Sequence, residues 1–455
     1  MRIYDIIDKK RQGKELSHEE IEFVISGYMN SEIQDYQVSA LLMAICINSM
    51  TKEETYHLTK AMLHSGEVLS LSTLGDKTVD KHSTGGIGDK TTLIVAPIVA
   101  SLGAKVAKMS GRGLGFTGGT IDKLESISGF KTELSANEFI SQVEKIGLAV
   151  IQQSENLVPA DKRLYALRDV TATIESIPLI ASSIMSKKLA SGSKSIVLDV
   201  KVGSGAFMKT IENARALANA MIDIGKSFGR NVTCIISNMD VPLGLCVGNK
   251  TELWEAIEVL SGRGEKNLKG LCFTVSASMI SSAFNVDYNQ ARKMVEDAVF
   301  SGSALARFYE WIEAQGGDVS EIKDSSLLLN AKYKRELYSK ESGYISRLDA
   351  QKIGTASMSL GAGRIKKGDK IDYSAGVVLS KSYGDRVECG ELVATFYSSS
   401  EELVNSDEAC AMFFEALSVS NEKPKEQTLI YEILKKISLF FSSSYYGNKK
   451  EGRII

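Results

Sequence analysis

Residues 1 to about 65 have the apolar spacing of several short amphipathic helices. Ser17 with Glu20, and Thr51 with Glu54, form capping-box patterns, in which paired side chains satisfy backbone N–H groups at the start of a helix. Between them, the apolar positions of residues 36–46 give one helix a broad face to bury against its neighbours. The pattern predicts a small helical bundle.

From about residue 78 onward, β-branched runs, glycine turns and amphipathic helices alternate, which is typical of an α/β domain. Residues 77–79 have strand character, and residues 91–102 and 135–145 are predicted helices, the second with a capping box at Ser135 and Glu138. Residues 195–201 and 231–237 are predicted to be buried strands. A sheet flanked by helices is therefore expected.

After about residue 340 the pattern changes to short strands broken by glycines, which predicts a compact β-rich domain. The turn at residues 384–390 is similar to that of lipoyl-type carrier domains, but no Met-Lys-Met attachment tip accompanies it, so a carrier role is disfavoured. Residues 434–455, which include aromatic residues and Lys449 with Lys450, are expected to form a tail.

Composition and charge exclude several classes of protein. The chain has 455 residues, 44% of them hydrophobic and 24% charged, and a net charge of -2, so a general nucleic-acid partner is not expected. The first residues lack the apolar run of a secretory signal, and no later stretch has membrane-spanning length, which leads us to expect a cytoplasmic protein without a membrane partner. The six cysteines show no CxxC pair and are expected to be reduced.

The densest group of chemically active residues lies at residues 80–92, where glycines, hydroxyls and cations precede a predicted helix. Glycines allow close backbone approach, and Lys81, Ser83 and Thr92 add hydrogen-bond donors, so the segment predicts an anion site for phosphate. An ordinary glycine-rich turn is the simple alternative. A nucleotide-binding P-loop is disfavoured because Asp89 separates Gly88 from Lys90.

A second glycine-rich stretch, residues 108–123, again exposes backbone N–H groups, and two such loops in succession suggest one shared ligand. Residues 113–118 match the GxGxxG pattern of dinucleotide-binding folds. No ribose-binding acid follows at the expected place, so a dehydrogenase is disfavoured.

A third region places Tyr165, Arg168, Ser183 and Lys187 on polar positions between apolar helices. These side chains could form a lining of donors and acceptors for a planar base. The alternative is that Arg168 simply pairs with Asp169 or another carboxylate, and the residues alone do not decide between the two.

Of the four histidines, His18, His57 and His64 fall in or beside helices of the bundle and are expected to be structural or exposed. Only His82 lies within a cluster of glycines and hydroxyls, where an imidazole could donate a proton near neutral pH.

Together the three segments resemble the pyrimidine-nucleoside phosphorylase and thymidine phosphorylase family, over residues 1 to about 433. The resemblance implies a helical domain (residues 1–70 with about 160–193), an α/β phosphate-binding domain (75–155 with 195–335) around a cleft, and a small β-rich domain (340–433). It implies a homodimer formed through the helical domains. The implied activity is that of a pentosyltransferase: reversible phosphorolysis of uridine, thymidine and 2′-deoxyuridine to the free base and (deoxy)ribose 1-phosphate.

The resemblance also implies residue roles, with His82, Arg168 and Lys187 as the catalytic group. The residues implied to hold phosphate are Lys81, Ser83, Thr92, Lys108, Ser110 and Thr120. Those implied to hold the pyrimidine are Tyr165, Arg168, Ser183, Lys187, Leu114 and Phe116. No cofactor is expected, and phosphate is the co-substrate.

Two positions depart from the family pattern. Some bacterial members hold potassium at positions that correspond to Gly88, Leu243, Cys246 and Glu255, with threonine where this chain has Lys90. The ammonium of Lys90 is expected to replace that ion, so added potassium is not expected to be required. Phe116 stands where the family has histidine, and its effect on specificity is left open. Broad pyrimidine specificity is favoured over a thymidine-restricted enzyme, a phosphoribosyltransferase or a silent nucleoside-binding protein.

Overall fold

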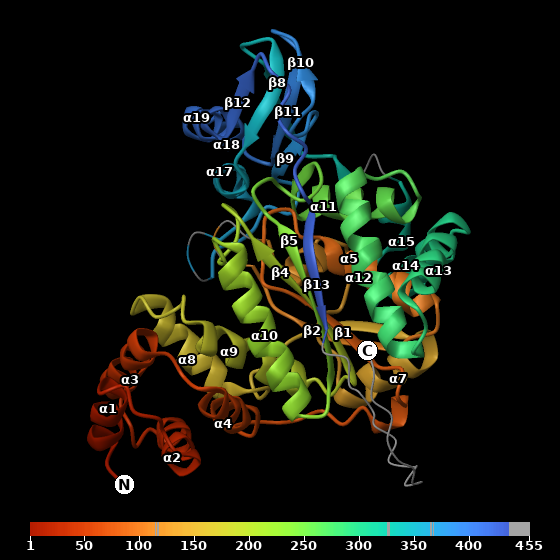
Figure 1. The fold of residues 1–455 in the computed structure, drawn as a ribbon. Coiled ribbons are helices and arrows are strands. Elements are labelled where there is room, and N and C mark those ends of the chain that lie inside the picture. Colours follow the sequence, from red (N-terminus) through yellow and green to blue (C-terminus); the bar gives the residue numbers. More distant parts are fainter. Residues whose placement is uncertain (114, 116–117, 325–327, 365, 367, 436–455) are drawn as a thin grey trace, which may run out of the picture.

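The computed structural model describes residues 1–435 except 114, 116–117, 325–327, 365 and 367. The chain forms a helical domain, a central α/β domain and a β-rich carboxyl-terminal domain, at one end, the middle and the other end of the molecule (Figure 1). This confirms the predicted fold class.

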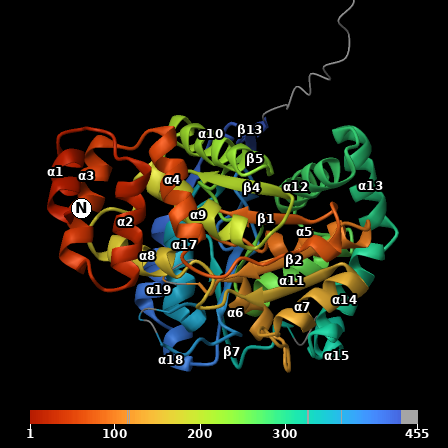
Figure 2. The same ribbon diagram turned by 90° about the horizontal axis from the view of Figure 1, so that it is seen from below.

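The helical domain is assembled from two parts of the chain. It contains α1 (Ile3–Arg11), α2 (His18–Met29), α3 (Asp35–Asn48), α4 (Lys52–Leu63), α8 (Pro159–Val170) and α9 (Ile177–Ala190). The predicted capping boxes begin α2 at Ser17 and α4 at Thr51, where each hydroxyl accepts a hydrogen bond from the backbone of the glutamate three residues on. The helices lie to one side of the α/β domain (Figure 2).

The central sheet has the order β1-β4-β5-β13, in which only the last pair is antiparallel. Its strands are β1 (Val79–Ser83), β4 (Ser195–Val202), β5 (Asn231–Asn238) and β13 (Ile430–Lys435). A parallel pair, β2 (Val106–Ser110) and β3 (Leu148–Gln152), lies beside β1 through the bridge between Thr78 and Lys105. The strands β4 and β5 were predicted, whereas β13 extends across the boundary expected at residue 433.

Helices cover both faces of this sheet, with α10 (Ile211–Ser227) on one face and α12 (Lys266–Phe284) on the other. The other helices of the domain are α5 (Thr91–Ser101), α6 (Thr120–Glu125), α7 (Ala136–Ile146), α11 (Asn249–Leu260), α13 (Tyr288–Phe300), α14 (Ser303–Ala314) and α15 (Val319–Lys323). Alternate residues of β4 serve different cores: Ile196 and Leu198 pack with the helical domain and α10, and Val197 packs with α5 and α12. The sheet therefore separates two hydrophobic cores.

The carboxyl-terminal domain is built on two small antiparallel sheets, β10-β8-β12 and β6-β9-β11-β7. Its strands are β6 (Cys246–Gly248), β7 (Tyr333–Tyr338), β8 (Gly343–Leu348), β9 (Gly376–Leu379), β10 (Arg386–Val387), β11 (Leu392–Ser398) and β12 (Leu417–Ser420). The helices are α17 (Ala350–Ser357), the π-helix η2 (Met358–Ala362), α18 (Glu401–Val404) and α19 (Asp407–Ala416). Because β6 precedes α11, the domain shares a sheet with the α/β region.

Candidate active site

A cavity of about 150 Å³ lies where β1 and β2 end. Parallel strands present their carboxyl ends at one edge of a sheet, so residues distant in sequence meet there. The lining side chains and backbone come from Lys81, His82, Ser83, Gly85, Gly86, Asp89, Thr92, Lys108, Ser110, Arg112, Gly113, Gly118, Gly119 and Thr120. Every residue expected to hold phosphate is among them.

The local structure differs from the sequence expectation in one respect. The strand predicted at residues 77–79 was expected to end before Lys81, but Lys81, His82 and Ser83 form the last residues of β1 itself. They pair in parallel register with Val197, Leu198 and Asp199 of β4, a partner strand that no local pattern reveals. The three side chains are thus held by a rigid sheet rather than by a loop.

Lys81 is surrounded by groups from the turn before α5. Its ammonium donates to the hydroxyl of Thr91 and lies 3.7 Å from a carboxylate oxygen of Asp89. Burial alone raises the pKa of Asp89, but the charges of Lys81 and Lys201 outweigh it and hold the pKa well below its ordinary value. Asp89 therefore stays ionised and fixes Lys81, a role that the sequence reasoning did not assign.

A fully buried carboxylate, Asp80, organises the lysines behind the cavity. Its Oδ2 lies 2.7 Å from the Nζ of Lys188, and its Oδ1 lies 3.4 Å from the Nζ of Lys108. Burial raises its pKa, but the two lysines outweigh that effect and lower the pKa below its ordinary value. Since Lys188 belongs to α9, this ion pair joins the helical domain to the α/β domain.

The positive charge around the cavity exceeds what these carboxylates neutralise, as two pKa shifts indicate. Burial, with the charges of Lys188 and Lys81, outweighs the opposing effect of Asp80 and lowers the pKa of Lys108 to about 7. Burial and the nearby lysines Lys188, Lys108, Lys187 and Lys81 lower the pKa of His82 well below its ordinary value. The site therefore favours a negatively charged occupant.

The expectation that His82 gives up a proton near neutral pH stays a prediction, and the lowered pKa concerns the protonation state of the free site. With a depressed pKa the ring is neutral in that range, because an imidazolium would be desolvated and repelled by the lysines. A neutral imidazole still carries one N–H donor and one acceptor nitrogen.

The residues expected to hold the pyrimidine lie on two adjacent helices. In α8, Tyr165 is 39% exposed and stacks against Arg168, whose guanidinium carbon is 5.9 Å from the ring centroid. In α9, the Nζ of Lys187 lies 3.3 Å from the hydroxyl of Ser183. Helical spacing places each pair on one face of its helix.

Lys187 has a carboxylate partner that the sequence reasoning missed. Its Nζ lies 2.7 Å from Oδ2 of Asp161, a residue of α8 that is only 4% exposed. Asp161 comes four residues before Tyr165, so helical spacing could have placed it on the same face as the base lining. Because Lys187 also acts on the charge of His82, this helical surface adjoins the phosphate cavity.

In the described residues, Arg168 is bound to the backbone rather than paired with Asp169, and its role in lining the base stays a prediction. Its guanidinium donates to three backbone carbonyls, those of Thr173, Leu179 and Ile174, at 3.1, 3.2 and 2.7 Å, and the residue is 3% exposed. The contacts fix the turn between α8 and α9. Leu114 and Phe116 lie outside the described residues.

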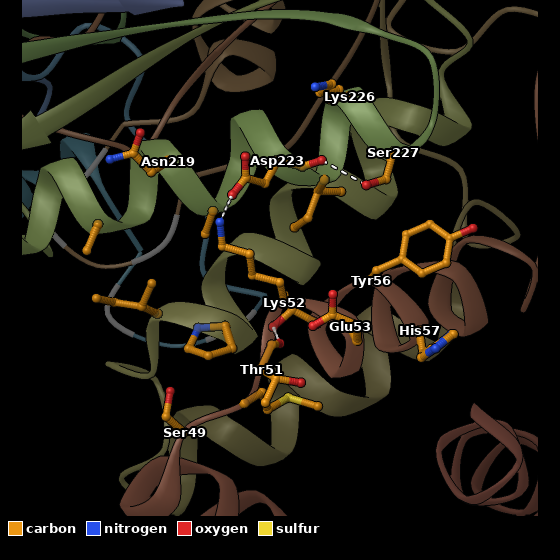
Figure 3. A pocket seen from close by; sticks show the side chains of 17 residues that line it. Ser49, Thr51, Lys52, Glu53, Tyr56, His57, Asn219, Asp223, Lys226 and Ser227 are labelled. Atoms are coloured by element: carbon orange, nitrogen blue, oxygen red, sulfur yellow. Dashed lines mark hydrogen bonds and ion pairs between the residues drawn. The ribbon is translucent and has the colours of Figure 1, made fainter. Parts of the chain in front are cut away.

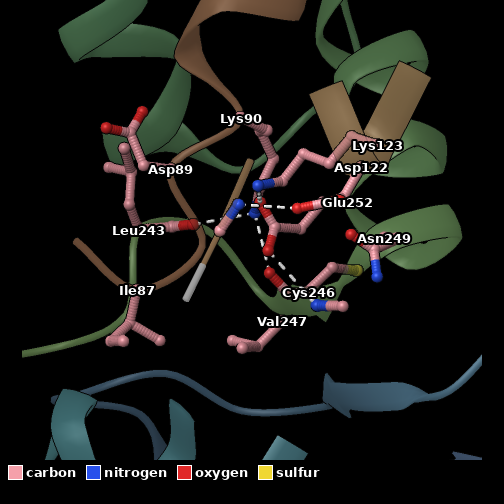
Figure 4. A network of polar contacts seen from close by, with 12 residues as sticks. Ile87, Asp89, Lys90, Asp122, Lys123, Leu243, Cys246, Val247, Asn249 and Glu252 are labelled. Carbon is pink, nitrogen blue, oxygen red and sulfur yellow. Dashed lines mark hydrogen bonds and ion pairs between the residues drawn. The ribbon is translucent and has the colours of Figure 1, made fainter. Parts of the chain in front are cut away.

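Lys90 occupies a separate buried site beside the cavity segment (Figure 4). Its Nζ donates to the carbonyls of Leu243 and Cys246 at 2.9 and 2.8 Å and to Glu255 at 2.5 Å. Burial alone lowers the pKa of Lys90, but Glu255 and Glu252 outweigh it and raise the pKa. A side chain at Gly88 would meet the carbonyl oxygen of Leu243 at 2.6 Å, so glycine permits the close approach.

A larger hollow of about 960 Å³ lies between α4, α9 and α10 (Figure 3). It is crossed by an ion pair of 2.7 Å between Lys52 and Asp223. Within the described chain, none of the predicted phosphate or pyrimidine residues lines it. Size alone would favour this hollow, but the charge and donor geometry favour the smaller cavity as the reaction site.

Other expectations concern metals, thiols and membranes. All six cysteines are free, and Cys234, Cys246 and Cys272 are buried, as expected for reduced thiols. Over residues 1–435 without the gaps given above, no cluster of three or more metal-ligating His, Cys, Asp or Glu side chains occurs. No helix in the same part of the chain is long and apolar enough to cross a membrane.

Comparison with known proteins identifies the class to which this fold and site belong. Residues 4–66 match the helical bundle domain of the glycosyl transferase family, residues 75–305 match its a/b domain, and residues 344–413 match the pyrimidine nucleoside phosphorylase C-terminal domain. The molecule is thus built as a glycosyl transferase of the bundle and α/β class.

Curated relatives narrow the assignment further. The chain is 52% identical over 433 residues to the pyrimidine-nucleoside phosphorylase of Geobacillus stearothermophilus, covering 95% of this chain and 99% of that protein. It is 50% identical over 435 residues to the protein of the same name from Bacillus subtilis, covering 95% and 100% of the two chains. The chain belongs to the pyrimidine-nucleoside phosphorylase family, as the sequence motifs predicted.

A solved structure extends the likeness of fold beyond this family. Anthranilate phosphoribosyltransferase from Thermus thermophilus aligns with a TM-score of 0.55 at 16% identity, over 68% of this chain and 98% of that one. At this identity the likeness concerns the fold alone.

Proposed function

We propose that this chain is a pentosyltransferase that catalyses the reversible phosphorolysis of uridine, thymidine and 2′-deoxyuridine to the free base and (deoxy)ribose 1-phosphate. One observation carries the proposal: all the residues expected to hold phosphate line a single lysine-rich cavity. The adjoining surface of α8 and α9 carries Tyr165, Ser183 and Lys187, which suit a planar base. Inorganic phosphate is the co-substrate in this proposal.

The proposed chemistry uses positioning and charge rather than a covalent enzyme intermediate. A phosphate oxygen held by Lys81, Ser83 and Lys108 attacks C1′ of the sugar as the bond from C1′ to the base breaks. Negative charge then develops on the departing pyrimidine, and the ammonium of Lys187, oriented by Asp161, stabilises it. Removing one such preorganised donor typically costs about 10²- to 10³-fold in rate.

Arg168 contributes indirectly in this scheme. Its contacts to the carbonyls of Thr173, Ile174 and Leu179 hold α8 against the start of α9, the two helices that carry the base lining. The guanidinium has N–H donors that are not used by these carbonyls, and they can still donate hydrogen bonds to a negatively charged base.

His82 acts in this scheme as a neutral hydrogen-bond donor beside the leaving base. Burial is the main cause of its lowered pKa, and two of the lysines that lower it further, Lys108 and Lys81, line the cavity where phosphate would neutralise them. A bound phosphate dianion therefore raises the pKa of His82 again, so that proton donation becomes accessible only with the co-substrate in place.

Closure of the helical domain onto the α/β domain would bring phosphate to the sugar and exclude water, which favours phosphorolysis over hydrolysis. The ion pair between Lys188 and Asp80 already ties α9 to β1. This ion pair therefore holds the helix that carries Lys187 close to the strand that carries Lys81.

We also propose that Lys90 replaces the monovalent cation that some family members hold at this place. Two carbonyls and the carboxylate of Glu255 form a donor set that suits a cation, but the Nζ of Lys90 fills the space between them. The residues present therefore do not fit a potassium ion in addition to the lysine.

We further propose a cytoplasmic homodimer formed through the helical domains. On α3, Tyr36 and Ile47 are 72% and 74% exposed, and helical spacing aligns them with Met43 along one face. Tyr4 of α1 and Val170 of α8 are similarly exposed. Exposed apolar side chains on one helix face are typical of an interface and support this proposal. An Ile47→Glu variant that sediments like the wild type would contradict it.

The decisive assay measures free base and sugar 1-phosphate after incubation with uridine, thymidine and 2′-deoxyuridine, with and without phosphate. We expect products from all three nucleosides, only with phosphate present. Release without phosphate would indicate a hydrolase, release from thymidine alone would indicate the restricted enzyme, and no release would favour a silent binding protein or a phosphoribosyltransferase.

The site assignment has its own test. Lys187→Ala should lose most of the activity, whereas Lys162→Ala should not, since Lys162 is an exposed lysine of α8 paired with Glu155. Full activity of Lys187→Ala would refute the assigned base site.

A further inference from the structure

One wall of the phosphate cavity is lined by Arg112, Gly113, Gly118, Gly119 and Thr120. Together with Gly115, these described residues are called the wall. A side chain at Gly119 would meet the backbone nitrogen of Gly113 at 2.1 Å, so the two ends of the wall touch. Contacts this short leave no room for side chains at these glycines, so the residues that hold the two ends together define the shape of the wall.

Asp122, in α6, gathers the polar contacts that hold the wall. It is 1% exposed, and its Oδ2 accepts the N–H of Gly113 at 2.6 Å. Its Oδ1 accepts a hydrogen bond of 2.8 Å from the Nη2 of Arg364. The guanidinium of Arg112 also lies near Oδ1, at 3.5 Å.

Arg364 comes from the carboxyl-terminal domain and contacts the wall at three points. Besides Asp122, its Nη1 donates to the carbonyl of Gly113 at 3.2 Å, and its own carbonyl accepts the N–H of Gly115 at 3.1 Å. The neighbouring Gly363 is also close, since a side chain there would meet the carbonyl oxygen of Gly115 at 2.7 Å. The planar guanidinium reaches its two acceptors, Asp122 and the carbonyl of Gly113, through two different nitrogen atoms, a geometry that the single nitrogen of an ammonium does not reproduce.

Further hydrogen bonds join the carboxyl-terminal domain to the α/β domain near Arg364 and near Arg112. The side chain of Asn249 donates to the carbonyl of Ala362 at 3.0 Å, which fixes the segment just before Arg364. The hydroxyl of Tyr373 lies 3.3 Å from a carboxylate oxygen of Glu125, which in turn pairs with Arg112. The wall is therefore held by residues that lie far from it in the sequence.

We propose that Arg364 is a positioning residue for the phosphate site, through which the carboxyl-terminal domain holds Gly113 and Gly115 of the wall, and Asp122 behind it, in their binding conformation. Arg364 is not among the residues that line the cavity in the described chain, so it acts through Gly113, Gly115 and Asp122. The proposal deepens the proposed function, on which it rests for the identity of the ligand. It gives the carboxyl-terminal domain a part in binding phosphate.

The test compares Arg364→Ala, Arg364→Lys and the wild type, with Arg347→Ala as the matched control. Arg347 is an exposed arginine of the same domain that pairs with Asp349. Two readouts need no turnover: calorimetric titration with inorganic phosphate, and hydrogen exchange of a peptide spanning residues 111–124 against one containing β1. Loss of the anchor should shift the wall by an amount that weakens phosphate binding about 10- to 100-fold.

The expected result has four parts. Arg364→Ala binds phosphate more weakly and exchanges faster in residues 111–124 but not in β1. Arg364→Lys lies between it and the wild type, because one ammonium restores only part of the contact, and Arg347→Ala resembles the wild type. Wild-type phosphate affinity in Arg364→Ala would overturn the proposal, as would faster exchange throughout the chain. If Arg364→Ala does not fold, the same criteria apply to Arg364→Lys.

The outcome separates this proposal from the proposed function. A wild-type protein that binds phosphate but releases no base would refute phosphorolysis and leave the role of Arg364 to be decided by the two readouts. A wild type that does not bind phosphate would refute both the cavity assignment and the part of Arg364 in it.

Discussion

Two buried lysines of one short segment, Lys81 and Lys90, have opposite surroundings. Lys90 is 1% exposed and its Nζ is enclosed by two carbonyls and a carboxylate, and Glu255 and Glu252 raise its pKa. Lys81 is also buried, but it borders a cavity together with Lys108, whose pKa is lowered to about 7. Lys90 is thus enclosed by its partners, whereas Lys81 is held by Asp89 and Thr91 and still borders an open cavity.

The difference shows how to separate a structural lysine from an anion-binding one. Burial of an ammonium is costly unless its charge is compensated. At Lys90 the chain supplies the compensation itself. At the cavity, burial and then the neighbouring lysines lower the pKa of Lys108 and of His82, and an anion would offset the repulsion by the lysines. A buried lysine beside an open cavity therefore predicts anion binding, whereas a buried lysine enclosed by its partners predicts a contribution to the stability of the fold.

The largest expected effect comes from Lys90→Met. Removing one partner of a buried ion pair leaves Glu255 uncompensated, which typically costs about 3–5 kcal/mol. We expect a large fall in the urea concentration at the unfolding midpoint. A variant with wild-type stability would show that the two lysine sites do not differ in the way proposed.

The matched variant for that experiment is Lys90→Thr, which restores the residue found in potassium-binding family members. Its stability should depend on potassium, since the freed space between Leu243, Cys246 and Glu255 can then hold the ion. Equal unfolding midpoints of Lys90→Thr in potassium and sodium would contradict the substitution of one cation by another.

Lys81→Met should show the reverse pattern, a loss of activity without a comparable loss of stability. The loss of one donor to phosphate is expected to lower kcat/KM by about 10²- to 10³-fold. Asp89 retains contacts with Thr91 and Ser83, so the fold should tolerate the change. Steady-state kinetics and the unfolding midpoint check the two halves, with exposed Lys77→Met as the control. Equal destabilisation by Lys81→Met and Lys90→Met would contradict the distinction between an anion-binding Lys81 and a structural Lys90.

Local sequence patterns predicted much of the fold because they report local physics. The capping boxes at Ser17, Thr51 and Ser135 begin α2, α4 and α7, since each satisfies N–H groups a single turn away. The buried apolar runs likewise predicted β4 and β5. The concentration of glycines, hydroxyls and lysines in two short segments predicted an anion site, and the family resemblance supplied the full set of phosphate residues, which all line one cavity.

The remaining features depend on contacts between distant parts of the chain. Asp80 pairs with Lys188 of α9, and Asp122 pairs with Arg364 of another domain. No pattern in the sequence near either aspartate indicates its partner. The strand β13 joins β5 although turns and a whole domain lie between them (Figure 1). The pKa of His82 could not be predicted for the same reason, because it depends on lysines from three elements that only the fold assembles.

A smaller effect is expected in the pH dependence of Lys108→Arg. The pKa of Lys108 is about 7, so the wild type loses this positive charge as the pH rises through that value, whereas arginine keeps its charge. The ratio of kcat/KM for phosphate, variant over wild type, should therefore increase from pH 6 to pH 9. Taking the ratio cancels the titration of phosphate itself. A ratio that stays constant would show that Lys108 remains charged across this range.

The smallest effect is predicted for the exchange of potassium for sodium with the wild-type enzyme. Because the ammonium of Lys90 contacts Leu243, Cys246 and Glu255 directly, no space between them is left for a metal ion to fill. We expect equal kcat and KM values in the two salts at matched ionic strength. Screening of the cavity lysines by either salt should be the same, since screening depends on ionic strength rather than on the identity of the monovalent cation. A strong dependence on potassium would mean that a metal ion acts elsewhere in the molecule and that Lys90 is not its replacement.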